Sequence, residues 1–231
     1  MPRTGILIAT VEEADAIIAN PKYRWRAIGV SSYESDAYPM TLMVSGVGKA
    51  FSAAAAAMLA RNCDLIVSIG TSGSIALDPV GSLKVCYGFF EHDMRAEALG
   101  FPRGITPLSP MTGPLIESCP PTLRAKINRM LADFRLPVEE ARAATGDQFV
   151  AGAAEAAGIA KEFGANLVDM ECAAIAKVCR YLIARPFFAL RWVSDNADHQ
   201  AGGEWSVLVE SAAKELDELL AHLLDSGLAN F

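Results

Sequence analysis

Acidic side chains stand inside apolar segments at three places in the chain. The segment NLVDMECAAIA places Asp169 and Glu171 where a helical pattern begins. Glu12 and Glu13 follow the apolar run GILIAT, and Asp195 follows the apolar run FFALRWVS. An ionised carboxylate is costly to bury unless a partner pairs with it or a reaction uses it. Carboxyl groups in such surroundings can act as general acids and bases, so these positions are candidates for proton-transfer chemistry.

The elements that carry these residues alternate between strand and helix. The β-rich runs GILIAT, TLMVSGVG and DLIVSIGTSGS are interrupted by the helical pattern KAFSAAAAAMLARN, an order typical of an α/β sheet. The first and last of these runs are almost continuously apolar, as in strands covered on both faces. Ligands in open α/β sheets bind outside the carboxyl ends of the strands, and the polar clusters all follow strands. The pattern therefore predicts one site at that edge.

The second half of the chain adds two helices and one long excursion. From Glu171 onward, apolar residues recur at helical spacing until Pro186 ends the helix, and FFALRWVS follows as a strand. The Gly- and Pro-rich stretch from Val85 to about Pro121 lacks periodicity and is predicted to be a functional excursion. A final helix, with Gly227 as its cap, carries a stripe of leucines. The stripe consists of Leu208, Leu216, Leu219, Leu220 and Leu223.

Composition and charge exclude several classes of protein. The 231 residues are 52% hydrophobic, and we expect one globular domain over residues 1–231. The net charge is −7 and no run of basic residues occurs, so we expect no nucleic-acid partner. The apolar run FSAAAAAMLA is too short to span a membrane, and no signal peptide is apparent. These features favour a soluble cytoplasmic protein without a membrane partner.

The sequence gives no support for a metal site or a disulfide framework. The cysteines lack CxxC spacing and lie in apolar segments, so we expect reduced, buried, structural thiols. The histidines are scattered, which argues against metal-ligand spacing and a Ser-His-Asp arrangement. These residues are Cys63, Cys86, Cys119, Cys172 and Cys179, and His92, His199 and His222.

Two glycine-containing segments leave alternatives open. SGVGK, residues 45–49, lacks the first glycine of a phosphate loop and has Ala50 in place of Ser or Thr, so a tight strand-to-helix turn is favoured. SIGTSGS, residues 68–74, either forms a turn that lets a helix pack closely or presents backbone N–H groups to an anion or a water. Asp195, taken alone, would equally suit a turn cap.

Taken together, GILIATVEEA, VSGVGKA, IVSIGTSGS, TGDQFV, LVDMECAAIAKVC and PFFALRWVSDNAD occur in a familiar order. The chain resembles the purine nucleoside phosphorylase superfamily and, within it, the 5′-methylthioadenosine/S-adenosylhomocysteine nucleosidases. The resemblance runs from about residue 5 to about residue 215. It implies a three-layer α/β/α fold around a central mixed sheet, usually a homodimer. It also implies hydrolysis of the N-glycosidic bond of an adenine nucleoside, with no cofactor and no metal.

The resemblance assigns roles to the acidic residues. Asp195 matches the aspartate that protonates N7 of adenine, and Glu13 matches the glutamate that activates water. A gapless alignment favours Glu13, and Glu12 is the alternative. Glu171 matches the carboxylate that binds the ribose hydroxyls, with Met170 beneath the sugar. Asp169 is then expected to be structural.

Further positions follow from the same resemblance, and together they would line one nucleoside site. Phe149 matches the ring that stacks on the base, and Val150 the backbone that reads the adenine edge. Arg191 and Thr71 match residues that fix the attacking water, and Trp205 replaces the aromatic residue beside the ribose. The remaining matches are Ser194 in the SDxAD segment, and Leu99, Phe101 and Pro107, which would line the 5′-alkylthio pocket of the neighbouring subunit. Leu99 stands for a phenylalanine, which leaves the preferred 5′ substituent open.

Two other functions compete with hydrolysis. Phosphorylases of the superfamily carry arginines before the GT/S-x-G loop and near the first strand, because a phosphate dianion needs cationic partners. Here Ser68 and Ile69 precede Gly70, and Glu13 stands near the first strand, which favours water as the attacking group. A non-catalytic nucleoside-binding module would need neither Glu13 nor Asp195.

Overall fold

Ten strands form one mixed sheet in this computed structural model, which describes residues 2–228. The strands are β1 (Thr4–Ile8), β2 (Trp25–Gly29), β3 (Ser32–Ser35), β4 (Met40–Val44), β5 (Leu65–Ser74), β6 (Leu83–Glu91), β7 (Ile116–Glu117), β8 (Val138–Thr145), β9 (Leu167–Asp169) and β10 (Phe187–Asp195). The helices are α1 (Val11–Ala19), α2 (Lys49–Leu59), α3 (Pro121–Ala132), α4 (Ala153–Phe163), α5 (Cys172–Lys177) and α6 (Ala201–Asp225). A 3₁₀ turn, η1 (Glu97–Leu99), and a π-helical turn, η2 (Val178–Leu182), complete these elements. The predicted α/β fold with a central mixed sheet is confirmed.

The sheet closes on itself around β10. Neighbouring strands follow the order β10-β6-β8-β9-β5-β1-β4-β3-β2, and β7 pairs with β6. Because β10 also pairs with β5, the strands β5, β10, β6, β8 and β9 form a closed ring. The strand–helix pattern did not predict this closure. Closure depends on pairing between segments far apart in the sequence, and it places Asp195 opposite Gly73.

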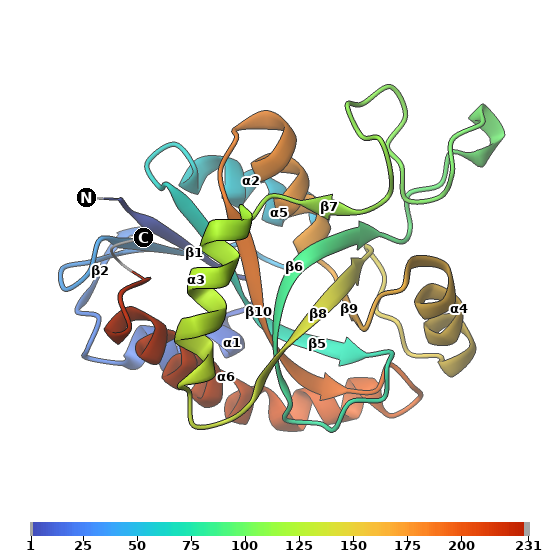
Figure 1. Cartoon of the computed structure of the whole chain (residues 1–231). Helices are drawn as coiled ribbons and strands as arrows, with labels where there is room; N and C mark the ends of the chain where they lie inside the picture. Colours follow the sequence, from blue (N-terminus) through green and yellow to red (C-terminus); the bar gives the residue numbers. More distant parts are fainter. Residues whose placement is uncertain (1, 229–231) are drawn as a thin grey trace.

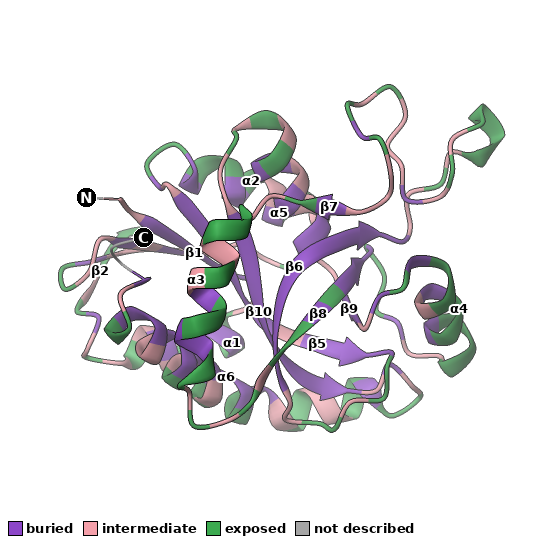
Figure 2. Cartoon of the chain, in the orientation of Figure 1, coloured by how far each residue is buried: buried purple, intermediate pink, exposed green. Residues whose placement is uncertain are grey.

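Helices cover both faces of the sheet (Figure 1). Helices α1, α3 and α6 pack on one face, and α2 and α5 pack on the other. Strand β1 contributes Ile6 and Ile8 to the first core and Leu7 to the second, as period-2 alternation requires. Figure 2 shows that the central strands β1, β5, β6 and β10 are largely buried between these layers. The continuously apolar run in β1 is thereby explained by burial on both faces.

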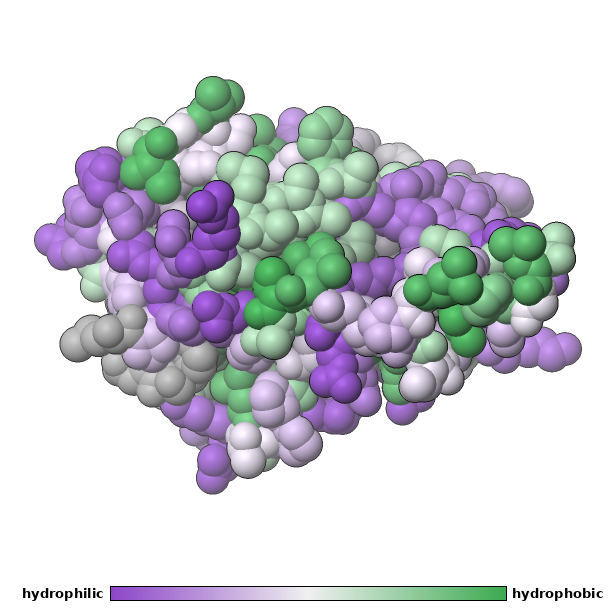
Figure 3. Space-filling model, turned by 90° about the horizontal axis from the view of Figure 1, so that it is seen from above, coloured by the Kyte–Doolittle hydropathy of each residue, from purple (hydrophilic) through white to green (hydrophobic). Residues whose placement is uncertain are grey.

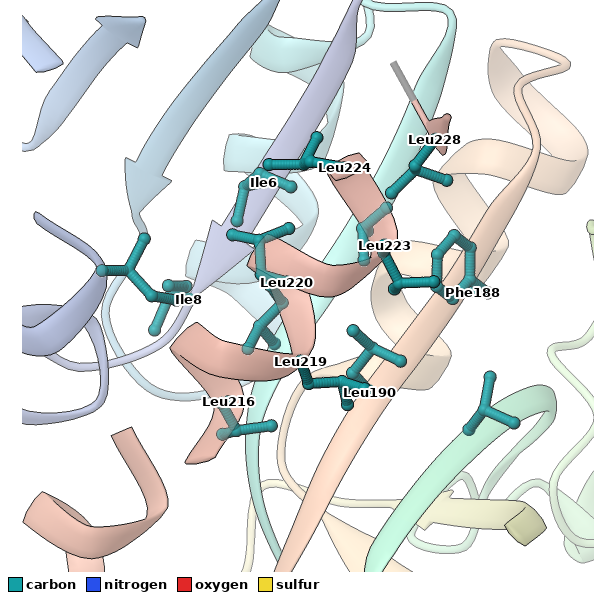
Figure 4. Close-up of a cluster of buried hydrophobic side chains, with 14 of the residues drawn as sticks. Ile6, Ile8, Phe188, Leu190, Leu216, Leu219, Leu220, Leu223, Leu224 and Leu228 are labelled. Atoms are coloured by element: carbon teal, nitrogen blue, oxygen red, sulfur yellow. The ribbon is translucent and has the colours of Figure 1, made fainter. Parts of the chain in front are cut away.

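Helix α6 anchors its side of the sheet through the predicted leucine stripe. Leu219, Leu220 and Leu223 are fully buried and lie toward β1 and β10, where they meet residues such as Ile6 and Phe188 (Figure 4). Leu208 is only half-buried but packs against the same core. Gly227 follows the helix with a φ of 98°, the left-handed conformation expected of a capping glycine.

Three local predictions need correction. The excursion does not begin at Val85, because residues 83–91 form the fully buried strand β6, and the irregular segment starts at His92. The GTSGS segment is not a turn, since it continues β5 to Ser74 and pairs with β10 and β9. Cys119 is half-exposed, whereas the other four cysteines are buried as predicted. The first two differences involve glycines and other small residues that lie inside the strands β6 and β5.

No helix within residues 2–228 is long and apolar enough to cross a membrane.

Candidate active site

A cavity of about 210 Å³ opens where β1, β5, β9 and β10 end. Nine residues predicted for the site line it: Glu13, Thr71, Phe149, Val150, Met170, Glu171, Ser194, Asp195 and Trp205. Four predicted residues are not in its lining: Arg191, Leu99, Phe101 and Pro107. The structure thus brings together side chains from six separate segments of the chain.

Glu13 enters the cavity from the first turn of α1. Thr10 and Glu13 form a capping box at the start of this helix, which fixes the helix N-terminus. The carboxylate Oε1 of Glu13 accepts hydrogen bonds from the Thr71 N–H (2.7 Å) and the Thr71 hydroxyl (2.8 Å). Glu13 is 4% exposed, whereas Glu12 lies on the surface. Of the two adjacent glutamates, only Glu13 faces the cavity.

Trp205 extends this hydrogen-bond chain from α6. Its indole Nε1–H donates to the Thr71 hydroxyl at 3.0 Å, and Thr71 in turn donates to Glu13. Gly70 permits the close approach of Glu13, because a Cβ at that position would lie 3.0 Å from Glu13 Oε1. The orientation of the Glu13 carboxylate is therefore set by β5 and α6 together.

Asp195 lies at the end of β10, against Gly73 of β5. Its Oδ2 accepts the Ser194 hydroxyl at 2.7 Å, and its Oδ1 accepts the Ala197 N–H at 2.9 Å. A Cβ on Gly73 would lie 2.7 Å from Asp195 Oδ1, which real side chains do not tolerate. Glycine is needed at this position for the carboxylate to take its observed place.

Glu171 lies at the start of α5 and is 8% exposed. Its Oε1 accepts the Gly48 N–H at 3.0 Å. Burial, and secondarily the charge of Asp169, raises the pKa of Glu171 to about 7. A carboxyl with this pKa changes its charge near neutral pH, in contrast to an ordinary glutamate.

Asp169, beside Glu171 in the cavity lining, forms a buried ion pair with Arg191. Arg191 donates to Asp169 Oδ2 at 3.0 Å and to the Ser68 hydroxyl at 3.0 Å, and its side chain is 2% exposed. Cys172 and Thr145 also donate to the Asp169 carboxylate. The guanidinium of Arg191 is held by this buried ion pair, and Arg191 does not line the cavity.

The segment after β8 forms the outer wall. Phe149 is 48% exposed at the cavity mouth, and Val150 behind it is buried. Gln148 also lines the cavity, and its side-chain amide donates to Glu155. An exposed aromatic ring over a cavity offers a flat surface on which a planar ligand can stack.

Three predicted residues lie on the excursion, outside the cavity lining. Leu99 is 72% exposed in η1, and Phe101 and Pro107 are half-buried further along. The excursion projects beyond the helical layers in Figure 1. Its apolar side chains lie at the surface at the right-hand end of Figure 3.

The cavity is acidic. Four carboxylates line it, and its lining contains no Lys, Arg or His. The Lys49 ammonium of the SGVGK segment binds Glu91 and Asp93, so this segment shows no free cation for a phosphate. Among residues 2–228 no group of three or more His, Cys, Asp or Glu is arranged to hold a metal ion.

Several lining residues were not predicted: Ala9, Thr10, Val47, Ser72, Gly73 and Val168. Most of them lie next to or near a predicted residue in sequence, so the same local motifs could have indicated that they line the cavity. Val47 comes from the SGVGK segment, for which the sequence favoured a tight strand-to-helix turn and gave no sign of a place in the wall of this cavity. Its place depends on tertiary packing.

Comparison with known proteins identifies the family. The sequence matches the phosphorylase superfamily over residues 3–229. The chain belongs to that superfamily. A 5′-methylthioadenosine/S-adenosylhomocysteine nucleosidase of Actinobacillus succinogenes is 29% identical over 230 residues, which cover 96% of this chain and 98% of the relative. An aminodeoxyfutalosine nucleosidase of Helicobacter pylori is 28% identical over 233 residues, covering 97% of this chain and 99% of the relative.

Solved structures agree with this membership of the phosphorylase superfamily. A mutant of the Helicobacter pylori 5′-methylthioadenosine/S-adenosylhomocysteine nucleosidase, with 5′-methylthioadenosine in its active site, superimposes with a TM-score of 0.86. The two sequences are 26% identical, and the match covers 97% of this chain and 99% of the other. The predicted superfamily is confirmed. The relatives are nucleosidases whose names give different 5′ substituents.

Proposed function

We propose that the protein hydrolyses the N-glycosidic bond of 5′-substituted adenine nucleosides and releases adenine. The observation that carries this proposal is the cavity lining, in which Glu13, Glu171 and Asp195 converge without a cation. Cleavage of an N-glycosidic bond passes through an oxocarbenium-like sugar, whose positive charge a carboxylate-lined cavity stabilises. The nucleosidase names of the full-length relatives point to the same reaction.

Asp195 is proposed as the acid that protonates N7 of the leaving adenine. Its hydrogen bonds with Ser194 and the Ala197 N–H hold the carboxyl in one orientation at the cavity wall. Phe149 would stack on the base, and the backbone of Val150 would bind the adenine edge. A protonated base is a better leaving group, so the acid acts on the bond that breaks.

Glu13 is proposed as the base that activates the attacking water. Glu13 contacts Thr71 of β5, and Asp195 lies against Gly73, two residues further along the same strand. Two residues of extended strand span roughly 7 Å. The base and the acid thus line one cavity from neighbouring positions of β5, and we propose that the sugar and the water lie between them, as in glycosidases that use water directly. Glu171 would accept the ribose hydroxyls, with Met170 against the sugar.

The acidic cavity favours water over phosphate as the group that attacks the sugar. A phosphate dianion beside Glu13 and Glu171 would meet like charges, which at a few ångströms costs several kcal/mol. Arg191, the buried cation nearest in sequence to Asp195, is paired with Asp169. Its proposed effect on the water is therefore indirect, through the position of Asp169 and β10.

We also propose that two copies of the chain associate and that the excursion of one completes the cavity of the other. Leu99 and Leu108 on the excursion, and Phe51 and Met58 on α2, are exposed apolar side chains. Apolar surface of this kind is typical of an interface. Sedimentation equilibrium should give twice the 24.6 kDa of one chain. A monomer at assay concentration would refute the association.

A substrate panel scored for free adenine tests the proposed function. The panel contains methylthioadenosine, S-adenosylhomocysteine, 5′-deoxyadenosine and aminodeoxyfutalosine, and it also determines the preferred 5′ substituent. Release of adenine from at least one member is expected. Thermal stabilisation by adenine without release from any member would instead identify a nucleoside-binding module.

A further inference from the structure

A charged cluster lies beside the cavity and has no part in the reaction described above. The ammonium of Lys49, at the start of α2, binds Glu91 Oε1 at 2.8 Å and Asp93 Oδ1 at 2.7 Å. Asp147 Oδ2 lies 3.8 Å from the same ammonium. The Lys49 side chain is only 19% exposed. Three carboxylates therefore surround the largely buried Lys49 ammonium, and Glu91 is in addition paired with Lys177.

Backbone hydrogen bonds close this cluster into a ring. The Lys49 N–H donates to Asp147 Oδ1 at 2.8 Å, and the Asp147 N–H donates to Asp93 Oδ2 at 2.8 Å. The same Oδ2 of Asp93 accepts a hydrogen bond from the Lys49 ammonium, which completes the ring. Each of the three residues comes from a different segment of the chain, so the ring ties three loops together.

Glycines allow these loops to come this close. A Cβ at Gly146 would overlap the His92 ring and lie 3.2 Å from Asp93 Cγ. Gly48 has a φ of 98°, and a Cβ there would lie 3.1 Å from Asp147 Oδ1. The close packing of the three loops thus depends on the absence of side chains on both sides of the ring.

Two of the three loops form walls of the cavity. Val47 precedes Lys49 by two residues, Phe149 follows Asp147 by two residues, and both line the cavity. Between Val47 and Lys49, the Gly48 N–H donates to Glu171. The ring therefore connects the wall that carries Phe149 to the loop that contacts Glu171.

We propose that Lys49 is a positioning residue for binding of the adenine ring. Through Asp93 and Asp147, Lys49 holds the segment 146–150 in place. The proposal rests on the proposed function, because it assigns base binding to Phe149 and Val150. Without the Lys49 ammonium, Asp93 and Asp147 lose the cation between them and their loops separate, whereas Glu91 keeps its partner Lys177. Burial alone would lower the pKa of Lys49, but the hydrogen bonds that its ammonium donates to Asp93 and Glu91 raise the pKa, so the side chain stays charged.

Lys84 provides a matched control. Its ammonium binds Asp78 at 2.7 Å and Glu139 at 2.6 Å, and the residue is 4% exposed. None of these three residues lines the cavity. Lys84→Met removes a comparable buried ion pair, so it reports the effect of general destabilisation alone.

The experiment compares wild type with Lys49→Met, Lys49→Arg and Lys84→Met by two measurements. The first is hydrogen–deuterium exchange of residues 146–152 without substrate, which reports local opening. The second is the steady-state kinetics of adenine release. Lys49→Met should exchange faster and raise KM about tenfold with a smaller change in kcat, as expected when binding common to ground and transition states is lost. Lys49→Arg should restore both measurements.

Two results would overturn the proposal: wild-type exchange and KM in Lys49→Met, or an equal rise of KM in Lys84→Met. If Lys49→Met does not fold, Asp147→Ala breaks the same ring from its exposed side and must then show the faster exchange and higher KM. Exchange is measured without substrate. A wild-type protein that releases no adenine would therefore refute the proposed function, while the exchange data still decide the role of Lys49.

Discussion

Replacing Glu171 with glutamine should remove a pH dependence of folding stability. Burial and the charge of Asp169 raise the pKa of Glu171 from an ordinary 4.5 to about 7 in the folded protein. Between these values the folded state keeps a proton that the unfolded state has lost, so stability falls as pH rises. The stabilising contribution is complete below pH 4.5 and is lost as pH passes through about 7. Glutamine cannot ionise, and its amide oxygen can still accept the Gly48 N–H.

The size of the effect follows from the two pKa values. Each pKa unit corresponds to 1.36 kcal/mol, so the interval from 4.5 to about 7 corresponds to roughly 3 kcal/mol. Glu171 is nearly fully buried, so solvent screening reduces this figure little. Relative to Glu171→Gln, the wild type should lose roughly this free energy of unfolding across the interval.

Urea unfolding of both proteins at a series of pH values measures this difference. Titration of the other groups is common to the two proteins and cancels in the comparison. The free energy of unfolding of the wild type, relative to that of Glu171→Gln, should fall between acid and neutral pH and should level off above neutral pH. A difference that stays constant over the whole range would refute the reasoning, because Glu171 would then have an ordinary pKa.

Four substitutions test the assignment of the acid and the base. Asp195→Asn should lower kcat by orders of magnitude while adenine still binds in calorimetry, because the proton donor acts in the transition state; near-wild-type turnover would remove Asp195 from the mechanism. Glu13→Gln should abolish hydrolysis with an unchanged circular dichroism spectrum, whereas Glu12→Gln on the surface should keep full activity, and the reverse pattern would mean that Glu12 is the base. Gly73→Ala should lower kcat with a folded protein, because its Cβ would lie 2.7 Å from Asp195 Oδ1 and displace the carboxylate; an unchanged kcat would show that the position of Asp195 tolerates this displacement.

The strands that support the site could be predicted from local sequence. Ile6, Leu7 and Ile8 are consecutive and apolar because β1 is buried on both faces. The boundaries were less predictable where small residues occur inside strands. For SIGTSGS the sequence left a turn and an exposed strand end as alternatives, whereas Gly70 and Gly73 lie within β5, where they let Glu13 and Asp195 approach.

The long-range contacts could not be read from the pattern. Pairing of β10 with both β5 and β6 closes the ring of strands, and no local periodicity encodes it. The ion pair of Arg191 with Asp169 and the ring around Lys49 also join segments distant in sequence. Motif order located Glu13, Glu171 and Asp195, whereas the partners that hold them depend on tertiary packing.

The identity of the sugar product tests the central claim most directly. Wild-type protein and methylthioadenosine are incubated with and without excess inorganic phosphate, and the products are separated by mass. The proposed mechanism predicts adenine and free methylthioribose at a rate that phosphate leaves unchanged. Formation of a sugar phosphate, at a rate that depends on phosphate, would contradict a water nucleophile in this carboxylate-lined cavity.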